Sequence, residues 1–200
     1  MIIIRHRRNT EDQLAEISSS HGAEIDIRSQ SEHLVLHHEP YEDGNRFDYW
    51  LENYDHGTLI LNVKEEGLED RVLELMTQHG IDDFFFLDQS FPFLVKTSNT
   101  GESRCAVRVS EFETIDTALS LAGKVDWVWV DCFTRFPLDR ESADRLKEAG
   151  FKLCIVSPEL QGRMEQSDTD EIVAAMDSAG VVPDAVCTKF PERWEKSSES

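Results

Sequence analysis

Two carboxylates separated by one residue are the feature of this sequence whose chemical use is easiest to read. They are Glu24 and Asp26, within the run Ala23-Glu24-Ile25-Asp26-Ile27-Arg28. In a β-strand successive side chains alternate between faces, so both acids lie on one face of the strand. Neighbours on one face stand roughly 6.5–7 Å apart, a span that one hard cation with oxygen ligands can bridge if both carboxylates lean inward. The spacing therefore predicts a site for a divalent metal ion.

Histidines occur on both sides of this acid pair. The run Arg5-His6-Arg7-Arg8 precedes it, and His37-His38-Glu39-Pro40 follows it. One imidazole can remove a proton from an attacking hydroxyl while a second protonates the leaving oxygen, and a metal with Arg or Lys can hold an anionic phosphorus centre. The pattern favours cleavage of a phosphodiester by His6 and His38. His37 points to the opposite face and is expected to be structural.

Short apolar runs that alternate with amphipathic stretches indicate which elements position these residues. The expected strands are Ile2–Arg7, Glu24–Arg28, Leu59–Lys64, Phe84–Leu87, Ala106–Val109, Trp127–Val130, Lys152–Val156 and Ala185–Cys187. Near-continuous apolar strands that alternate with helices are typical of a parallel sheet. Eight such strands favour an α/β fold, a compact (β/α)8 TIM barrel, with an open doubly wound sheet as the alternative.

Helical spacing of apolar residues fits most of the intervening segments. The expected helices are 10–19, 68–79, 114–122, 139–149 and 169–179, with Gly80, Gly150 and Gly180 after three of them. Leu34–Leu36 is expected to extend the second strand or to form a hairpin with it, and Phe47, Trp50 and Leu51 form one short helical stripe. The connection from Asp88 to Arg104 shows little helical pattern.

Composition limits the class of protein. With 200 residues and 40% hydrophobic content, one domain over residues 1–194 is expected, followed by a disordered polar tail over 195–200. A net charge of −20 disfavours nucleic acid and anionic membranes as partners. No signal-peptide core or membrane-span pattern is present, so a cytoplasmic protein is expected. The four cysteines lie far apart in apolar runs, which predicts reduced core thiols.

Active-site residues of such a barrel lie at the carboxyl ends of its strands. The charged and polar residues expected there form a ring of acids, bases and two histidines: His6, Arg7, Glu24–Arg28, His38, Asn62, Lys64, Asp88, Arg108, Asp131, Glu159 and Lys189. The acidic run Glu65-Glu66 with Glu69-Asp70 is interpreted as a solvated face.

The order of these motifs resembles a known enzyme superfamily. His6-Arg7, then Glu24-x-Asp26, then His38 followed by an acid, then a strand ending in Lys64 is similar to the glycerophosphodiester phosphodiesterase and phosphatidylinositol-phospholipase-C-like superfamily, which usually reads H-R-G, E-x-D, H-D and E-x-K. The resemblance runs from Ile2 to about Trp194. The segment Leu61-Asn62-Val63-Lys64 and the segment Ser157-Pro158-Glu159-Leu160 look like a little-characterised bacterial branch of that superfamily.

The resemblance implies a TIM-barrel phosphoric diester hydrolase that acts on a glycerophosphodiester-like or sugar-linked phosphodiester. It implies His6 and His38 as the acid/base pair, Glu24, Asp26 and Asn62 as ligands of a Mg²⁺ or Ca²⁺ ion, and Arg7 and Lys64 beside the phosphate. Arg108 joins the substrate-binding residues only through its place at a strand end. The implied partner is a small anionic phosphodiester; the sequence gives no oligomeric state.

Three departures from the superfamily pattern affect this site. Arg8 stands where the superfamily has Gly, Asn62 stands where a third acidic ligand is expected, and Glu39 replaces Asp after the histidine. An amide oxygen binds Mg²⁺ or Ca²⁺ without adding negative charge, so metal affinity should fall. Two alternatives therefore stay open: a catalytically impaired homologue that binds a phosphorylated ligand or a protein partner, and a lyase-like relative of sphingomyelinase D. Attack by water and a cyclic-phosphate route both fit the pattern.

Overall fold

The computed structural model describes residues 1–195, which divide into two compact units. The N-terminal unit is Ile4–Arg104, and the C-terminal unit consists of Met1–Ile3 together with the chain from Cys105 onward. The single domain expected over residues 1–194 stays a prediction. Of the expected polar tail, Glu195 ends the last helix, and residues 196–200 lie outside the described part of the chain.

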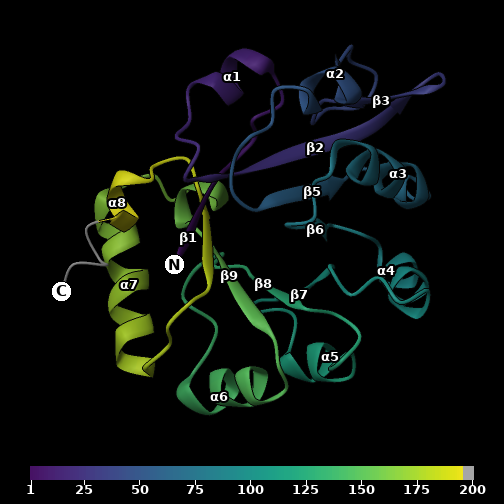
Figure 1. Ribbon diagram of the computed structural model, residues 1–200. Coiled ribbons are helices and arrows are strands. Elements are labelled where there is room, and N and C mark those ends of the chain that lie inside the picture. The colour runs from purple at the N-terminus through teal and green to yellow at the C-terminus, as the bar shows by residue number, and fades with distance from the viewer. Residues whose placement is uncertain (196–200) are drawn as a thin grey trace. The chain divides into compact units, whose positions relative to one another are not determined.

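Strand β2 (Gly22–Gln30) is the central strand of the N-terminal unit (Figure 1). It runs parallel to β1 (Ile2–Arg5) on one side and to β5 (Leu59–Val63) on the other, and β5 is parallel to β6 (Phe84–Leu87). Strands β3 (His33–Leu36) and β4 (Asn45–Arg46) continue from β2 in antiparallel pairing. The β2–β5 register places Asp26 opposite Asn62.

Four helices complete this unit: α1 (Glu11–Ala15), α2 (Phe47–Leu51), α3 (Glu69–His79) and α4 (Phe91–Asn99). Helix α1 begins with a capping box, because the Thr10 side chain accepts from Gln13 N and the Gln13 side chain accepts from Thr10 N. Helix α3 ends at Gly80, whose φ of 66° is the left-handed conformation that glycine adopts without strain. Helix α4 lies in the connection where the sequence showed little helical pattern.

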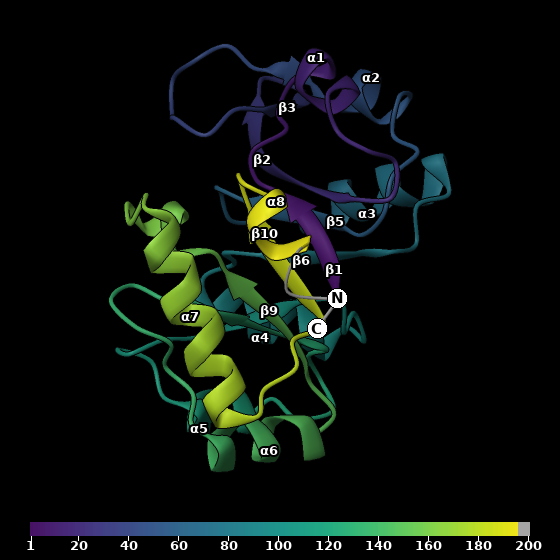
Figure 2. The same ribbon diagram turned by 90° about the vertical axis from the view of Figure 1, so that its left-hand side faces the viewer.

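The C-terminal unit repeats the alternation of strand and helix. Its strands β7 (Ala106–Val109), β8 (Trp127–Val130), β9 (Lys152–Val156) and β10 (Ala185–Thr188) are parallel to one another in that order. Its helices are α5 (Ile115–Leu119), α6 (Arg140–Glu148), α7 (Gln166–Ala179) and α8 (Glu192–Glu195), with a 3-10 turn at Pro158–Gln161. The longest of these helices, α7, runs beside β9 and β10 (Figure 2).

All eight strands expected from the sequence are present, and each pairs in parallel with a neighbour. Every residue of β5, β6, β8 and β10 is buried, which accounts for their continuous apolar character. The four cysteines are buried free thiols, as predicted. Among the described helices none is long and apolar enough to cross a lipid bilayer.

Candidate active site

Glu24 and Asp26 lie on β2 with side chains 1% and 0% exposed. Glu24 Oε2 accepts a hydrogen bond of 2.8 Å from the backbone N–H of Arg7, and its Oε1 accepts one of 2.8 Å from Asn62 Nδ2. His6 Nε2 lies 3.8 Å from Glu24 Oε2. The segment after β1 and the end of β5 therefore both place polar groups next to Glu24.

Asp26 is held by a residue that the sequence analysis did not place in the site. Asn9 donates from Nδ2 to Asp26 Oδ2 at 2.9 Å and accepts the Asp26 backbone N–H through Oδ1 at 2.8 Å. One amide side chain thus fixes both the backbone and the carboxylate of Asp26. The only signal in the sequence is the position of Asn9 directly after the His6-Arg7-Arg8 run.

Burial and mutual repulsion govern the electrostatics of the pair. Desolvation raises the pKa of Glu24, and the nearby charge of Asp26 raises it further, to about 7. Hydrogen bonds from Asn62 and from the Arg7 backbone, and the charge of Lys64, act in the opposite direction. The Glu24 carboxylate is therefore favoured as an anion by positive charge close by.

Two cationic side chains meet Asp26. Lys64 Nζ lies 3.2 Å from Asp26 Oδ1 and 3.3 Å from Asp88 Oδ2, and Arg7 Nε lies 3.7 Å from Asp26 Oδ2. Arg7 has a φ of 51°, in the left-handed region that non-glycine residues seldom occupy. Arg8, which stands where the superfamily has Gly, does not have a positive φ. The Arg8 side chain pairs with Glu16 at 3.4 Å.

His38 follows β3 and is oriented by its neighbour. Its Nδ1 lies 2.6 Å from Glu39 Oε1, and its carbonyl oxygen accepts from Arg28 Nε and Nη2 at 3.1 and 2.9 Å. The bond with His38 lowers the pKa of the Glu39 carboxyl, and the charge of Arg7 acts in the same direction. The backbone N–H of His37 donates to Asp26 O at 3.0 Å, which anchors the histidine segment to β2 beside the second acid.

The candidate ligands of a metal ion are oxygen atoms of Glu24, Asp26 and Asn62. Oδ1 of Asp26 and Oδ1 of Asn62 are buried and form no hydrogen bond with any described residue. Two carboxylates and one amide oxygen are donors that suit a hard divalent cation. No cluster of three or more His, Cys, Asp or Glu residues suited to a metal occurs within residues 1–195. The residues fit such an ion only if Asn62 contributes its oxygen.

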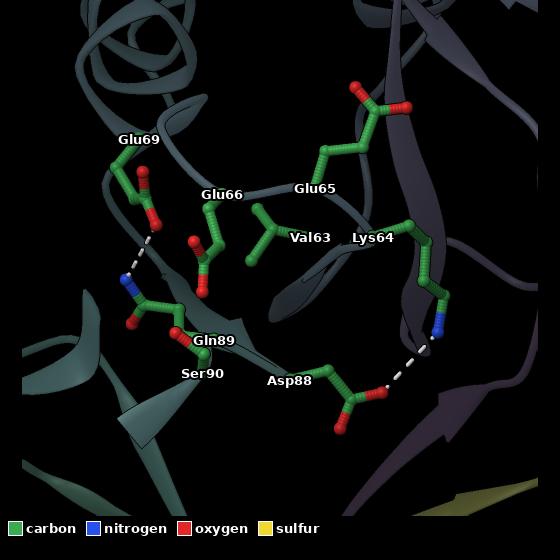
Figure 3. A pocket seen from close by; sticks show the side chains of 8 residues that line it. All are labelled: Val63, Lys64, Glu65, Glu66, Glu69, Asp88, Gln89 and Ser90. Atoms are coloured by element: carbon green, nitrogen blue, oxygen red, sulfur yellow. Dashed lines mark hydrogen bonds and ion pairs between the residues drawn. The ribbon is translucent and has the colours of Figure 1, made fainter. Parts of the chain in front are cut away.

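A hollow of about 230 Å³ lies at the carboxyl ends of β5 and β6 (Figure 3). It is lined by Val63, Lys64, Glu65, Glu66, Glu69, Asp88, Gln89 and Ser90. Figure 3 shows the Lys64 ammonium directed at Asp88 and the Glu69 carboxylate directed at Gln89. The expectation that this acidic run is wholly solvated is wrong for Glu69, which is 6% exposed because it accepts a hydrogen bond from Gln89 at the start of α3.

The remaining strand-end residues lie in the C-terminal unit. Arg108 on β7 forms an ion pair with Asp131, which also accepts a hydrogen bond of 2.6 Å from Gln161 Nε2. Glu159 is buried and accepts from Thr188 Oγ1 and from the Lys189 backbone N–H at 2.6 and 2.8 Å. These contacts give Asp131 and Glu159 structural partners. A role for Arg108 in substrate binding stays a prediction.

Comparison with known proteins adds evidence at the level of the fold. No protein-family model matches the chain, and no curated protein matches it in sequence. A crystal structure of glycerophosphodiester phosphodiesterase from Agrobacterium tumefaciens is similar with a TM-score of 0.71 and 16% identity, covering 100% of both chains. A glycerophosphoryl diester phosphodiesterase from Parabacteroides distasonis gives a TM-score of 0.70 and 15% identity, over 98% of this chain and 85% of that one.

A mutant tryptophan synthase α-subunit from Pyrococcus furiosus is similar at a lower level, with a TM-score of 0.58 and 9% identity over 99% of this chain and 93% of that one. One architecture can host unrelated reactions, so the argument for function rests on the site residues. At the level of the fold the comparison supports the sequence resemblance over the whole chain. The chain has the α/β fold of the glycerophosphodiester phosphodiesterases, the superfamily that its histidine and acid motifs resemble.

Proposed function

We propose that this protein is a metal-dependent phosphodiester hydrolase whose substrate is a glycerophosphodiester-like or sugar-linked phosphodiester. The observation that carries the proposal is the cluster around β2. A histidine lies 3.8 Å from the buried carboxylate of Glu24, and the neighbouring Asp26 faces Lys64 and Arg7. Two solved structures with this fold are glycerophosphodiester phosphodiesterases, which are phosphoric diester hydrolases.

Glu24, Asp26 and Asn62 are the residues that would hold the metal ion. A divalent ion at these oxygens would supply positive charge to the phosphate as it gains negative charge in the transition state. Arg7 and Lys64 lie beside Asp26 and would bind the phosphate oxygens.

His6 and His38 are the proton-transfer groups of the proposal. The Glu24 carboxylate near His6 Nε2 and the Glu39 carboxylate on His38 Nδ1 both stabilise an imidazolium. The Glu39 carboxylate also orients the His38 imidazole through this short contact. One ring accepts the proton of the attacking hydroxyl, and the other donates a proton to the leaving oxygen.

A second candidate function is favoured by the orientation of Asn62. Its amide nitrogen, not its oxygen, faces Glu24, and an ammonium lies against Asp26. A protein with this arrangement and no metal would bind a phosphorylated ligand without cleaving it. Calorimetric titration with Mg²⁺ or Ca²⁺ separates the two functions, because a non-catalytic binding protein of this kind takes up neither ion.

Turnover of a glycerophosphodiester in the presence of Mg²⁺ or Ca²⁺ tests the proposal. Replacing His6 or His38 by Ala should each lower kcat by about 10²-fold or more, the usual contribution of a general acid or base. His33→Ala is the matched control, because His33 is exposed at the start of β3. Wild-type rates in both site variants would contradict the proposal.

A further inference from the structure

Lys64 directly follows β5, and its side chain faces the acid pair on β2. Its backbone N–H donates to Ile27 O at 3.0 Å, so the side chain starts from a fixed point next to β2. Its ammonium lies 3.2 Å from Asp26 Oδ1, and the two side chains are 14% and 0% exposed. Water screens such a contact poorly, so this ion pair is stronger than one on the surface.

The oxygen that Lys64 faces is the one a metal would use. Asp26 Oδ2 already accepts from Asn9, whereas Oδ1 is buried and accepts no hydrogen bond from the described residues. Arg7 Nε lies 3.7 Å from Oδ2. An ammonium and a divalent cation therefore compete for Oδ1 of Asp26.

We infer that Lys64 is the internal counter-cation of the Glu24–Asp26 pair: it holds the pair in place without metal, and it must leave Asp26 before a divalent ion can bind there. This inference rests on the proposed function. It adds to that function a way in which metal binding at the site is regulated. It predicts a site that keeps its geometry when the metal is removed and that binds divalent ions weakly.

Asp88 gives Lys64 a second position. Asp88 Oδ2 is 3.3 Å from Nζ, and the side chain is 29% exposed, at the rim of the hollow in Figure 3. An ammonium that moves away from Asp26 toward Asp88 keeps one ion pair and gains contact with water. The displacement is therefore less costly than leaving a buried ammonium without a partner.

The test combines Mn²⁺ titration calorimetry with thermal unfolding in chelator. Lys64→Met keeps the length of the side chain and removes its charge. We expect it to tighten Mn²⁺ binding at least tenfold, which corresponds to about 1.4 kcal/mol, and to lower the melting temperature in chelator by several degrees. Lys64→Arg keeps the charge and should bind Mn²⁺ as the wild type does. Lys96→Met, at an exposed position on α4, is the matched control and should change neither quantity.

Mn²⁺ binding that is unchanged or weaker in Lys64→Met would overturn the inference, as would absence of Mn²⁺ binding in both proteins. These readouts do not depend on turnover. If the protein cleaves phosphodiesters and Lys64→Met lowers turnover without changing Mn²⁺ affinity, Lys64 only contacts the phosphate and the inference fails. If Lys64→Met gains metal affinity in a protein without phosphodiesterase activity, the inference holds and the proposed function fails.

Discussion

At the residue scale, both buried acids of β2 have polar or charged neighbours in the described part of the chain. Arg7 N–H and Asn62 Nδ2 reach Glu24, and Asn9 and Lys64 reach Asp26. The placement of Glu24 and Asp26 on one strand could be predicted from the sequence, because they are separated by one residue within an apolar run. The catalytic roles of His6 and His38 stay predictions. The role of Asn9 could not be predicted, since it depends on a turn that folds the segment after β1 back onto β2.

The substitution Asn62→Asp adds a third carboxylate to the proposed metal ligands. It should tighten Mn²⁺ binding by about tenfold or more, since ligand charge raises the affinity for hard cations. In chelator the same variant should unfold at a lower temperature, because it replaces the amide donor to Glu24 by another buried negative charge. Asn53→Asp, at an exposed position, is the control for added charge. Unaltered Mn²⁺ affinity in Asn62→Asp would remove Asn62 from the ligand set.

The raised pKa of Glu24 predicts how stability depends on pH without metal. Unfolded Glu24 ionises near its usual pKa of 4.5, and the folded carboxyl keeps its proton up to about 7. Between these values the folded protein binds more protons, so stability falls as pH rises, by about 3 kcal/mol in total.

The measurement for this prediction is urea unfolding in chelator at a series of pH values, compared with Glu24→Gln. The variant has no titrating group at this position and should lack this part of the decline, whatever its absolute stability. Parallel curves for the two proteins between pH 4.5 and 7 would show that Glu24 does not titrate in this range.

At the element scale, the parallel strands were predictable because strands buried on both faces form near-continuous apolar runs. Helix α4 was missed for an equally physical reason. Its buried residues are Leu94, Thr97 and Ser98, so its inner face is largely polar and the hydrophobic period is hidden. Gln89 supplies the hydrogen bond that lets Thr97 be buried, through Nε2 at 2.8 Å from Thr97 Oγ1.

Close approach of β2 to the segment before β5 depends on Gly22. A Cβ at this position would lie 2.1 Å from the backbone oxygen of Thr58. Gly22→Ala should therefore push the two elements apart and destabilise the protein by about 1–3 kcal/mol, the usual cost of overpacking, or more. It should also lower activity, because the acids follow on the same strand.

Urea unfolding measures this effect. Gly123→Ala is the control, since its Cβ would meet nothing within 4 Å and its cost arises only from the left-handed φ of 74°. A smaller loss of stability for Gly22→Ala than for Gly123→Ala would show that the strands separate easily.

At the scale of the whole molecule, the charge of −20 creates a negative electrostatic potential around the site proposed to bind an anionic phosphodiester. The cations at the site, Arg7 and Lys64, must overcome that potential locally, and a bound divalent ion would help them. The fold alone does not define the reaction, since a tryptophan synthase α-subunit is also similar to this chain. The case for phosphodiester chemistry therefore depends on the residues around β2.

Net charge of this size predicts how stability responds to salt. Raising NaCl from about 20 to about 200 mM should raise the melting temperature, because screening weakens repulsion among carboxylates more than it weakens the exposed ion pairs. Differential scanning calorimetry in chelator checks this prediction. A melting temperature that falls with NaCl would mean that surface ion pairs outweigh the repulsion.

The most direct test of the proposed site is an anomalous-scattering map of crystals soaked in Mn²⁺. The arrangement around β2 predicts a single strong peak roughly 2.0–2.6 Å from carboxylate oxygens of Glu24 and Asp26 and from Oδ1 of Asn62, with the Lys64 ammonium moved to Asp88. A map without a peak at these oxygens, in which Lys64 still contacts Asp26, would contradict the metal-dependent phosphodiesterase site.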